Sequence, residues 1–119
     1  MKILVAEDQP MILRAISRQL QHAGFEVLQA YDGEKAMRMY DSESPDMVVT
    51  DLLMPFASGL EVISHIRKKS RRIPILVLST VGNDSVIIEA FKNGADDYVK
   101  KPFHSGELVA RINRLVSNK

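Results

Sequence analysis

The sequence contains no cysteine among its 119 residues, so it can form neither a disulfide framework nor a thiolate metal site. It also has no excess of one charge. Sixteen basic and 15 acidic residues give a net charge of +1, which does not favour a nucleic-acid or membrane surface. No apolar run is long enough to span a membrane, and the short N-terminal run is followed at once by acidic residues, unlike a signal peptide. We therefore expect a cytoplasmic protein that makes no direct contact with nucleic acid or membrane.

What is present is typical of one globular domain. The chain is 45% hydrophobic and 26% charged, and its length allows a single compact core. No repeat, low-complexity tract or linker divides it. We expect one domain over residues 1–119, either alone or as the N-terminal part of a longer regulator.

Short apolar runs alternate with longer amphipathic segments. The expected strands are Ile3–Ala6, Glu26–Ala30, Met47–Thr50, Ile75–Ser79 and Tyr98–Lys100. The expected helices are Pro10–Ala23, Gly33–Tyr40, a segment that begins with a capping box at Ser58, Asp84–Asn93 and Glu107–Val116. This alternation predicts an α/β fold of the flavodoxin-like (βα)5 type: a three-layer sandwich whose parallel five-stranded sheet has the order 2-1-3-4-5.

Polar residues follow the central strands of this predicted sheet. Glu7 and Asp8 follow the first strand, Asp51 ends the third, Ser79 ends the fourth and Lys101 follows the fifth. Because the carboxyl ends of parallel strands share one edge, where such folds bind ligands, we expect these side chains to meet there. Acidic residues at strand ends often only cap the next helix, but five converging groups favour a site.

The residue types suggest phosphoryl chemistry with Mg²⁺. Three carboxylates in one pocket repel one another unless a cation joins them, and a purely oxygen ligand set suits Mg²⁺. An Asp held in this way can attack phosphorus. The metal, Lys101 and the Ser79 hydroxyl could then each stabilise one oxygen of the transferred group.

Five segments of the chain resemble the receiver domain of two-component response regulators, at the spacing of that family. They are A-E-D at 6–8, D-L-L-M-P at 51–55, G-L-E at 59–61, P-I-L-V-L-S-T at 74–80 and G-A-D-D-Y-V-K-K-P-F at 94–103. The resemblance covers essentially the whole chain. It implies a phosphorylation-activated switch rather than an enzyme, one that assists its own phosphorylation and dephosphorylation.

The resemblance also implies the acceptor and its metal site. Asp51 matches the residue that takes a phosphoryl group from the phosphohistidine of a sensor histidine kinase or phosphotransfer protein. Glu7, Asp8, Asp51 and the backbone carbonyl of Leu53 match the Mg²⁺ ligands.

Further residues match the family's switch. Lys101 and Ser79 correspond to the groups that contact the phosphoryl oxygens, and the Lys101–Pro102 peptide would be cis. Ser79 and Tyr98 correspond to the pair that moves on activation and changes the surface of the fourth helix, fifth strand and fifth helix. That surface would then control a protein partner, dimerisation or an attached DNA-binding domain.

The chain departs from the family pattern at four positions. Glu7 stands where Asp is commonest, Thr80 where Ala or Gly is usual, and His104 where a helix-capping residue is frequent. Leu53 stands where a polar group often helps water to attack the phosphoryl group. Leu53 and Thr80 together predict slow self-dephosphorylation.

A phosphorylation-linked homodimer through the fourth helix, fifth strand and fifth helix is a further hypothesis. The ion-pair ladder of related dimers is matched at Asp97, Glu107, Arg111 and Arg114. Ile87 and Asn93 break the ladder, because charged residues are expected at both positions.

Several polar residues outside the site have a simpler interpretation. Asp96 and Asp97 are expected to be surface acids, and His22 and His65 solvated helix residues. The basic run 67–72 ends a predicted helix, where cations suit the helix dipole and the solvent, so a nucleic-acid contact is not expected there.

Two other functions stay open at this point. A pseudo-receiver would keep the fold without being phosphorylated, although the complete set of acidic, hydroxyl and lysine residues argues against it. A Mg²⁺-dependent phosphatase with an Asp nucleophile commonly needs a second Asp two residues further on, where this chain has Leu53.

Overall fold

The computed structural model describes residues 1–80 and 84–117. Its strands are β1 (Lys2–Ala6), β2 (Glu26–Ala30), β3 (Met47–Asp51), β4 (Ile75–Thr80) and β5 (Asp97–Lys101). Its helices are α1 (Pro10–His22), α2 (Gly33–Glu43), α3 (Gly59–Lys69), α4 (Asp84–Asn93) and α5 (Ser105–Ser117). Every strand pairing is parallel and the order is β2-β1-β3-β4-β5, so the predicted fold class and sheet order are confirmed.

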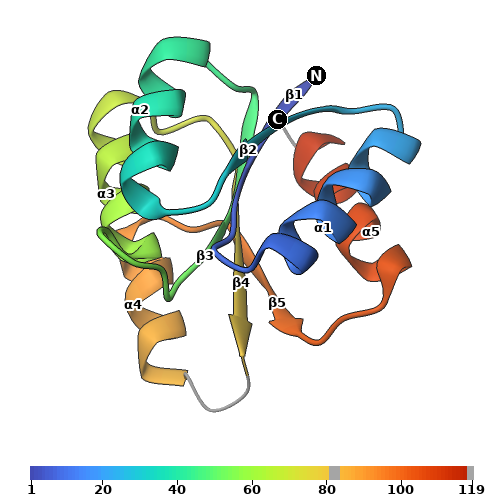
Figure 1. Cartoon of the computed structure of the whole chain (residues 1–119). Helices are drawn as coiled ribbons and strands as arrows, with labels where there is room; N and C mark the ends of the chain where they lie inside the picture. Colours follow the sequence, from blue (N-terminus) through green and yellow to red (C-terminus); the bar gives the residue numbers. More distant parts are fainter. Residues whose placement is uncertain (81–83, 118–119) are drawn as a thin grey trace.

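The sheet lies between two helical layers. α1 and α5 cover one face, and α2, α3 and α4 cover the other (Figure 1). Successive residues of a central strand alternate between the two layers: Ile3 and Val5 pack with α1 and α5, while Leu4 packs on the opposite side. This explains why β1, β3 and β4 are almost wholly apolar, since each needs a buried side chain on both faces.

Local chemistry sets the helix ends. Ser58 and Glu61 form the expected capping box at the start of α3, and Gly24 follows α1 with a φ of 96°, a conformation that favours glycine. α2 runs past the predicted Tyr40 and ends where Ser44 turns left-handed, with a φ of 48°. α5 begins two residues earlier and ends one residue later than predicted, and α1 ends one residue earlier.

The strands also extend further than predicted, and this matters for the site. Asp51 pairs with Leu78 in the β3–β4 ladder, and Thr80 pairs with Lys101 in the β4–β5 ladder. Asp51 and Lys101 are therefore part of the sheet rather than of the loops beyond it. Their backbones are fixed by strand pairing on the edge where the chemistry gathers.

Two predictions about surface residues were wrong. The side chain of Arg67 is only 14% exposed, and its guanidinium donates to the carbonyls of Gly94, Ser70 and Ile73 as well as to Asp96. It therefore joins the end of α3 to the turn before β5 instead of facing solvent. His65, predicted to be a solvated helix residue, keeps 27% of its side chain exposed, and its ring nitrogen lies 2.9 Å from Asp41.

Asp97 was likewise predicted to be a surface acid, but it is buried. Arg111 Nη1 lies 3.1 Å and Arg114 Nη2 3.0 Å from Asp97 Oδ2. Two guanidinium groups from α5 therefore compensate the carboxylate within one chain. Asp96, by contrast, is exposed as predicted.

Candidate functional site

The carboxyl edge of the sheet brings together the acidic residues expected there. Oxygen atoms of Glu7, Asp8 and Asp51 lie within 4.8 Å of one another. The backbone N–H of Glu7 donates to the Ala30 carbonyl at 3.0 Å, which fixes the residue against β2. Glu7 is fully buried, Asp51 is 7% exposed and Asp8 is half-buried.

Asp51 is held on both of its carboxylate oxygens. Oδ1 accepts hydrogen bonds from the backbone N–H of Leu52 at 2.7 Å and of Leu53 at 3.4 Å. Oδ2 accepts from Lys101 Nζ at 2.8 Å. A buried carboxylate is costly unless it is hydrogen-bonded and paired, and these contacts supply both kinds of compensation.

The backbone beside Asp51 is tightly packed. A Cβ atom placed on Gly59 would lie only 2.2 Å from the Asp51 carbonyl oxygen, and the Gly59 N–H donates to the Leu52 carbonyl at 2.9 Å. Only glycine allows the start of α3 to come this close to the end of β3. Asp51 is therefore fixed from the α3 side as well as by the sheet.

Lys101 connects two of the three carboxylates. Its Nζ lies 2.8 Å from Glu7 Oε1 and 2.8 Å from Asp51 Oδ2. Burial alone would lower the pKa of Lys101, but its hydrogen bonds to Asp51 and Glu7 outweigh that effect and raise it. The lysine stays charged and neutralises part of the acidic cluster.

The pKa of Glu7 is raised as well, but in a carboxyl group this favours the neutral form, whereas in Lys101 it favours the charged form. Burial raises the pKa of Glu7, and the nearby charge of Asp51 adds to the rise, while the hydrogen bonds from Lys101 and the Gln9 N–H oppose it. Oε1 is engaged by Lys101 and Oε2 accepts from Gln9 N at 3.1 Å. Both oxygens are therefore already bonded, as in Asp51, which leaves the half-buried Asp8 as the most accessible of the three carboxylates.

The cluster fits a hard divalent cation. Three carboxylates converge on a small volume at a partly open edge, and no histidine or cysteine ligand takes part. Such an oxygen set suits Mg²⁺ better than a transition metal. The structure brings Glu7, Asp8 and Asp51 together as predicted, while the role of the Leu53 carbonyl stays a prediction.

The switch residues lie where their strands place them. Ser79 is buried, and its hydroxyl donates to the Thr80 carbonyl at 3.3 Å. Tyr98 is half-buried, and its ring packs edge-on against Phe91, with ring centroids 6.1 Å apart. The Lys101–Pro102 peptide is cis, as predicted. The movement assigned to Ser79 and Tyr98 stays a prediction.

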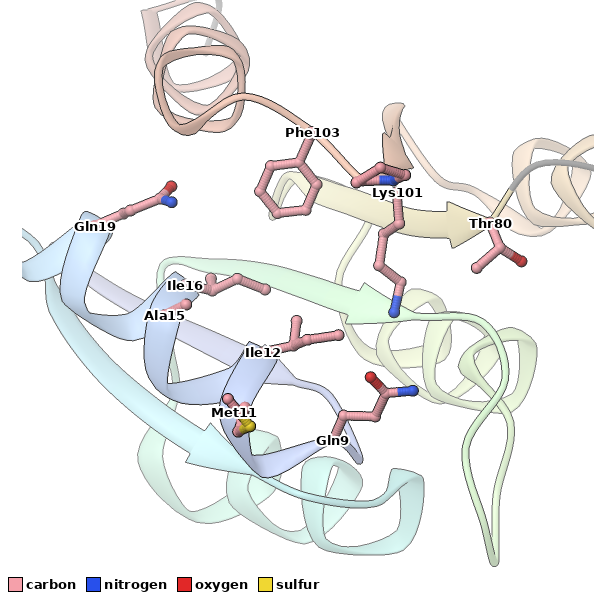
Figure 2. A pocket seen from close by; sticks show the side chains of 10 residues that line it. Gln9, Met11, Ile12, Ala15, Ile16, Gln19, Thr80, Lys101 and Phe103 are labelled. Atoms are coloured by element: carbon pink, nitrogen blue, oxygen red, sulfur yellow. The ribbon is translucent and has the colours of Figure 1, made fainter.

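The sequence did not reveal a groove that opens beside Lys101. This groove has a volume of about 470 Å³ and runs between α1 and the segment after β5. Its lining includes Gln9, Met11, Ile12, Ala15, Ile16, Gln19, Thr80, Pro102 and Phe103. Figure 2 shows Lys101 and Gln9 extending toward one another at one end, with Met11 and Ile12 on the exposed start of α1. In the sequence, the one indication of such a groove was Met11, an apolar residue next to the apolar stripe of α1.

The comparisons with known proteins agree with this geometry. The family model of the response regulator receiver domain matches residues 3–113. The chain belongs to this family. It is therefore a receiver domain of the kind found in two-component response regulators, proteins that generally are not enzymes in the usual sense.

The relatives include proteins with regulatory names. A probable transcriptional regulator ycf27 of Cyanophora paradoxa is 43% identical over 97% of this chain, and 48% of that protein is covered. The alkaline phosphatase synthesis transcriptional regulatory protein PhoP of Bacillus subtilis is 34% identical, with the same coverage. The chain thus spans about half the length of these curated relatives.

Solved structures share the whole fold. A putative response regulator from Chloroflexus aurantiacus superposes with a TM-score of 0.92 at 31% identity, covering 98% of this chain and 97% of that one. The chemotaxis response regulator CheY4 of Vibrio cholerae gives a TM-score of 0.90 at 31% identity, over 96% and 97% of the two chains. Within residues 1–80 and 84–117, no helix has both the length and the apolar character needed to cross a membrane.

Proposed function

We propose that this receiver domain accepts a phosphoryl group on Asp51 from the phosphohistidine of a sensor histidine kinase or phosphotransfer protein. One observation carries the proposal: Asp51 shares Lys101 with the buried Glu7 inside an acidic cluster suited to Mg²⁺. A carboxylate placed next to both a fixed ammonium group and a cation site can approach an anionic phosphoryl group, which it would otherwise repel.

The proposed transfer exchanges one bond to phosphorus for another. An Asp51 oxygen forms a bond to phosphorus as the bond between phosphorus and the donor imidazole nitrogen breaks, and the imidazole keeps the bonding electrons. Mg²⁺ held by Asp8, Asp51 and the Leu53 carbonyl, with Glu7 acting directly or through water, would neutralise charge on the phosphoryl oxygens. In the unphosphorylated protein Lys101 is bonded to the Asp51 carboxylate. After transfer, its ammonium group would turn toward a second phosphoryl oxygen.

The Ser79 hydroxyl is the proposed ligand of the third oxygen. Its present bond to the Thr80 carbonyl is long, at 3.3 Å, so exchanging it for a charged phosphoryl oxygen is favourable. Movement of Ser79 would leave room for Tyr98 to turn inward, away from its edge contact with Phe91. The surface formed by α4, β5 and α5 would then shift between two populations.

That surface is the proposed output. The regulatory names of the relatives support control of transcription through an attached DNA-binding domain, and such a regulator would work in the cytoplasm.

A phosphorylation-linked homodimer through α4, β5 and α5 is the finer form of this proposal. Asp97 is already paired with Arg111 and Arg114 within the chain, so a dimer would have to exchange these ion pairs between protomers. Unchanged sedimentation on addition of beryllofluoride, a phosphoryl mimic, would remove the dimer.

The proposed acceptor activity is tested with a small phosphodonor. Purified protein is incubated with acetyl phosphate, with Mg²⁺ or with a chelator, and its intact mass is recorded beside Asp51→Ala. We expect a single phosphoryl adduct that requires Mg²⁺ and is absent from Asp51→Ala. Failure to form the adduct with acetyl phosphate and with phosphorylated histidine kinases alike would support the pseudo-receiver instead.

A further inference from the structure

The loop between β3 and α3 carries an aromatic residue in an unfavourable position. Phe56 has a φ of 70°, in the left-handed region where a residue with a Cβ atom is disfavoured. The Ala57 N–H donates to the Pro55 carbonyl at 2.8 Å, so Phe56 is the central residue of a three-residue turn of the rare left-handed form. Glycine or asparagine would adopt this conformation more easily.

The same residue is exposed. Phe56 is 82% accessible, the highest value among the large hydrophobic residues in the part of the chain that the structure describes. A side chain this exposed gains little from packing within its own domain. Both the backbone conformation and the exposure of Phe56 are therefore unfavourable for the isolated domain, which points to a role in contact with another molecule.

The loop that carries Phe56 makes close backbone contacts with the domain on both sides. On one side, a Cβ atom on Gly33 would lie 1.9 Å from the Ala57 carbonyl oxygen, so the loop rests directly on the start of α2. On the other side, Gly59 contacts the Asp51 backbone and its N–H donates to Leu52. A preformed contact of this kind costs little entropy when a partner binds.

The position of the loop identifies the partner. Phe56 and Gly59 are three positions apart in the chain, so the two lie within about 11 Å of one another, and Gly59 touches the backbone of the proposed acceptor Asp51. A protein that delivers a phosphoryl group must place its histidine directly over Asp51. A typical interface covers about 800 Å² of each partner, equivalent to a disc about 16 Å in radius. An interface of this size centred on Asp51 extends about as far as the loop that carries Phe56.

Other exposed apolar residues border the same site. Leu53 is 57% exposed at the start of the loop, and Met11 is 77% exposed on α1 in the wall of the groove beside Lys101. Exposed apolar side chains thus lie both in the loop that follows Asp51 and in the groove beside Lys101. A small phosphodonor that enters the pocket has no need to contact Phe56, whereas a protein donor would cover it.

We propose that Phe56 is an anchor for the protein that donates the phosphoryl group, and that it selects protein donors without taking part in the chemistry. This inference rests on the proposed acceptor function of Asp51. The donor surface opposite Phe56 would provide an apolar pocket near its phosphohistidine, as expected for an aromatic anchor in an interface.

The test uses Phe56→Asn, because asparagine tolerates the left-handed conformation and keeps the turn. Ile88→Gln serves as the matched control, since Ile88 is 57% exposed on α4, outside the loop and the groove. Two donors are compared: acetyl phosphate with Mg²⁺, and each histidine kinase or phosphotransfer protein of the source genome, phosphorylated beforehand. The donor that phosphorylates the wild type fastest is used for the variants.

We expect Phe56→Asn to react with acetyl phosphate within twofold of the wild-type rate and to unfold at the same or a higher temperature. Its kcat/KM with the protein donor should fall at least tenfold, mainly through KM, while Ile88→Gln is unchanged. Wild-type transfer rates from the protein donor to Phe56→Asn would overturn the proposal, as would equal losses with both donors, which would indicate a role in site geometry. Self-association of the wild type that Phe56→Asn abolishes, without a change in transfer, would assign Phe56 to a second copy instead. No reaction of the wild type with any donor would refute the acceptor function itself.

Discussion

Lys101 Nζ lies 2.8 Å from Asp51 Oδ2 across the end of the sheet, although 50 residues separate the two in sequence. The same nitrogen is equally close to Glu7, so one ammonium group compensates two buried carboxylates. The lysine therefore has two consequences in the unphosphorylated protein: it stabilises an acidic cluster, and it is positioned for the group that Asp51 is proposed to receive.

Removal of this ammonium group should destabilise the domain in a way that Mg²⁺ partly reverses. Lys101→Met leaves two buried carboxylates without their partner, and breaking a buried ion pair in this way costs about 3 kcal/mol. A cation bound at the cluster would supply the missing charge, so the free energy of unfolding should depend more on Mg²⁺ in the variant than in the wild type. Urea denaturation with and without Mg²⁺ measures both effects.

Lys100→Met is the matched control, because Lys100 is exposed on the same strand. It should change the free energy of unfolding by less than about 0.5 kcal/mol. Equal stability of Lys101→Met and the wild type without Mg²⁺ would contradict the role assigned to the lysine.

The raised pKa of Glu7 should make the stability of the metal-free protein depend on pH. The pKa of Glu7 lies above its ordinary value of 4.5 in the folded protein, so the folded state binds this proton more tightly than the unfolded state. This contribution to stability is fully present below 4.5 and is lost as the pH rises through the folded pKa. Glu7→Gln stays neutral and avoids the loss, so its stability relative to the wild type should increase with pH through this window.

Urea denaturation in the presence of a chelator, at several pH values from 4 to 8, tests this prediction. Glu34→Gln, which alters an exposed residue of α2, should show no such trend. A stability difference that decreases as the pH rises would mean that the Glu7 charge favours folding. Mg²⁺ binding, measured by calorimetry, should weaken in Glu7→Gln because one of the three carboxylates is lost.

The sequence was sufficient to predict the fold, and to predict that Glu7, Asp8, Asp51 and Lys101 meet at one edge of the sheet, because both follow from local patterns. The apolar runs defined the strands, and the sheet order brought Glu7, Asp51 and Lys101 to one edge. The errors concern contacts made across the fold. Asp97 is buried because Arg111 and Arg114 reach it from α5, and no local pattern reveals that pairing.

The unusual loop was missed for a related reason. Phe56 is an ordinary residue in the sequence, and its positive φ belongs to a loop whose two sides pack closely at Gly33 and Gly59, contacts that no local pattern reveals. Arg67 was assigned to the solvent because it belongs to a basic run, yet its guanidinium binds three carbonyls that only the folded chain brings together. The roles of Ser79, Tyr98 and the Leu53 carbonyl stay predictions.

The contact between Gly59 and the Asp51 backbone should be intolerant of even one added methyl group. Gly59→Ala would place a Cβ atom 2.2 Å from the Asp51 carbonyl oxygen, which forces the end of β3 and the start of α3 apart. We expect a loss of about 2–3 kcal/mol in stability and slower phosphorylation, because the acceptor moves. Gly106→Ala is the control: a Cβ atom there meets open space, and alanine in a helix is neutral or stabilising by up to about 1 kcal/mol.

Both variants are measured by thermal unfolding and by the rate of reaction with acetyl phosphate. Gly59→Ala with the stability of the wild type would show that β3 and α3 can separate without cost, and that Asp51 is not fixed from the α3 side.

Leu53 should prolong the lifetime of the phosphorylated state. It is 57% exposed two residues after Asp51, and its apolar side chain cannot orient a water molecule for attack on phosphorus. Leu53→Asn adds a group that can, and orientation of water should shorten the lifetime at least about tenfold. Leu53→Met, which stays apolar, should leave it unchanged. Loss of the phosphoryl group is followed by intact mass after the donor is removed.

A wild-type lifetime of seconds that Leu53→Asn does not alter would contradict this role. Thr80→Ala, tested in the same way, separates the contribution of Thr80 from that of Leu53.

The identity of the acceptor residue is the central point, and one measurement addresses it directly. The protein is phosphorylated with acetyl phosphate and Mg²⁺, reduced with borohydride to convert an aspartyl phosphate into homoserine, digested and sequenced by mass spectrometry. We expect homoserine in place of Asp51 and at no other position. Homoserine in place of Asp8, or a phosphoryl group found only on serine, threonine or histidine, would contradict the assignment of Asp51.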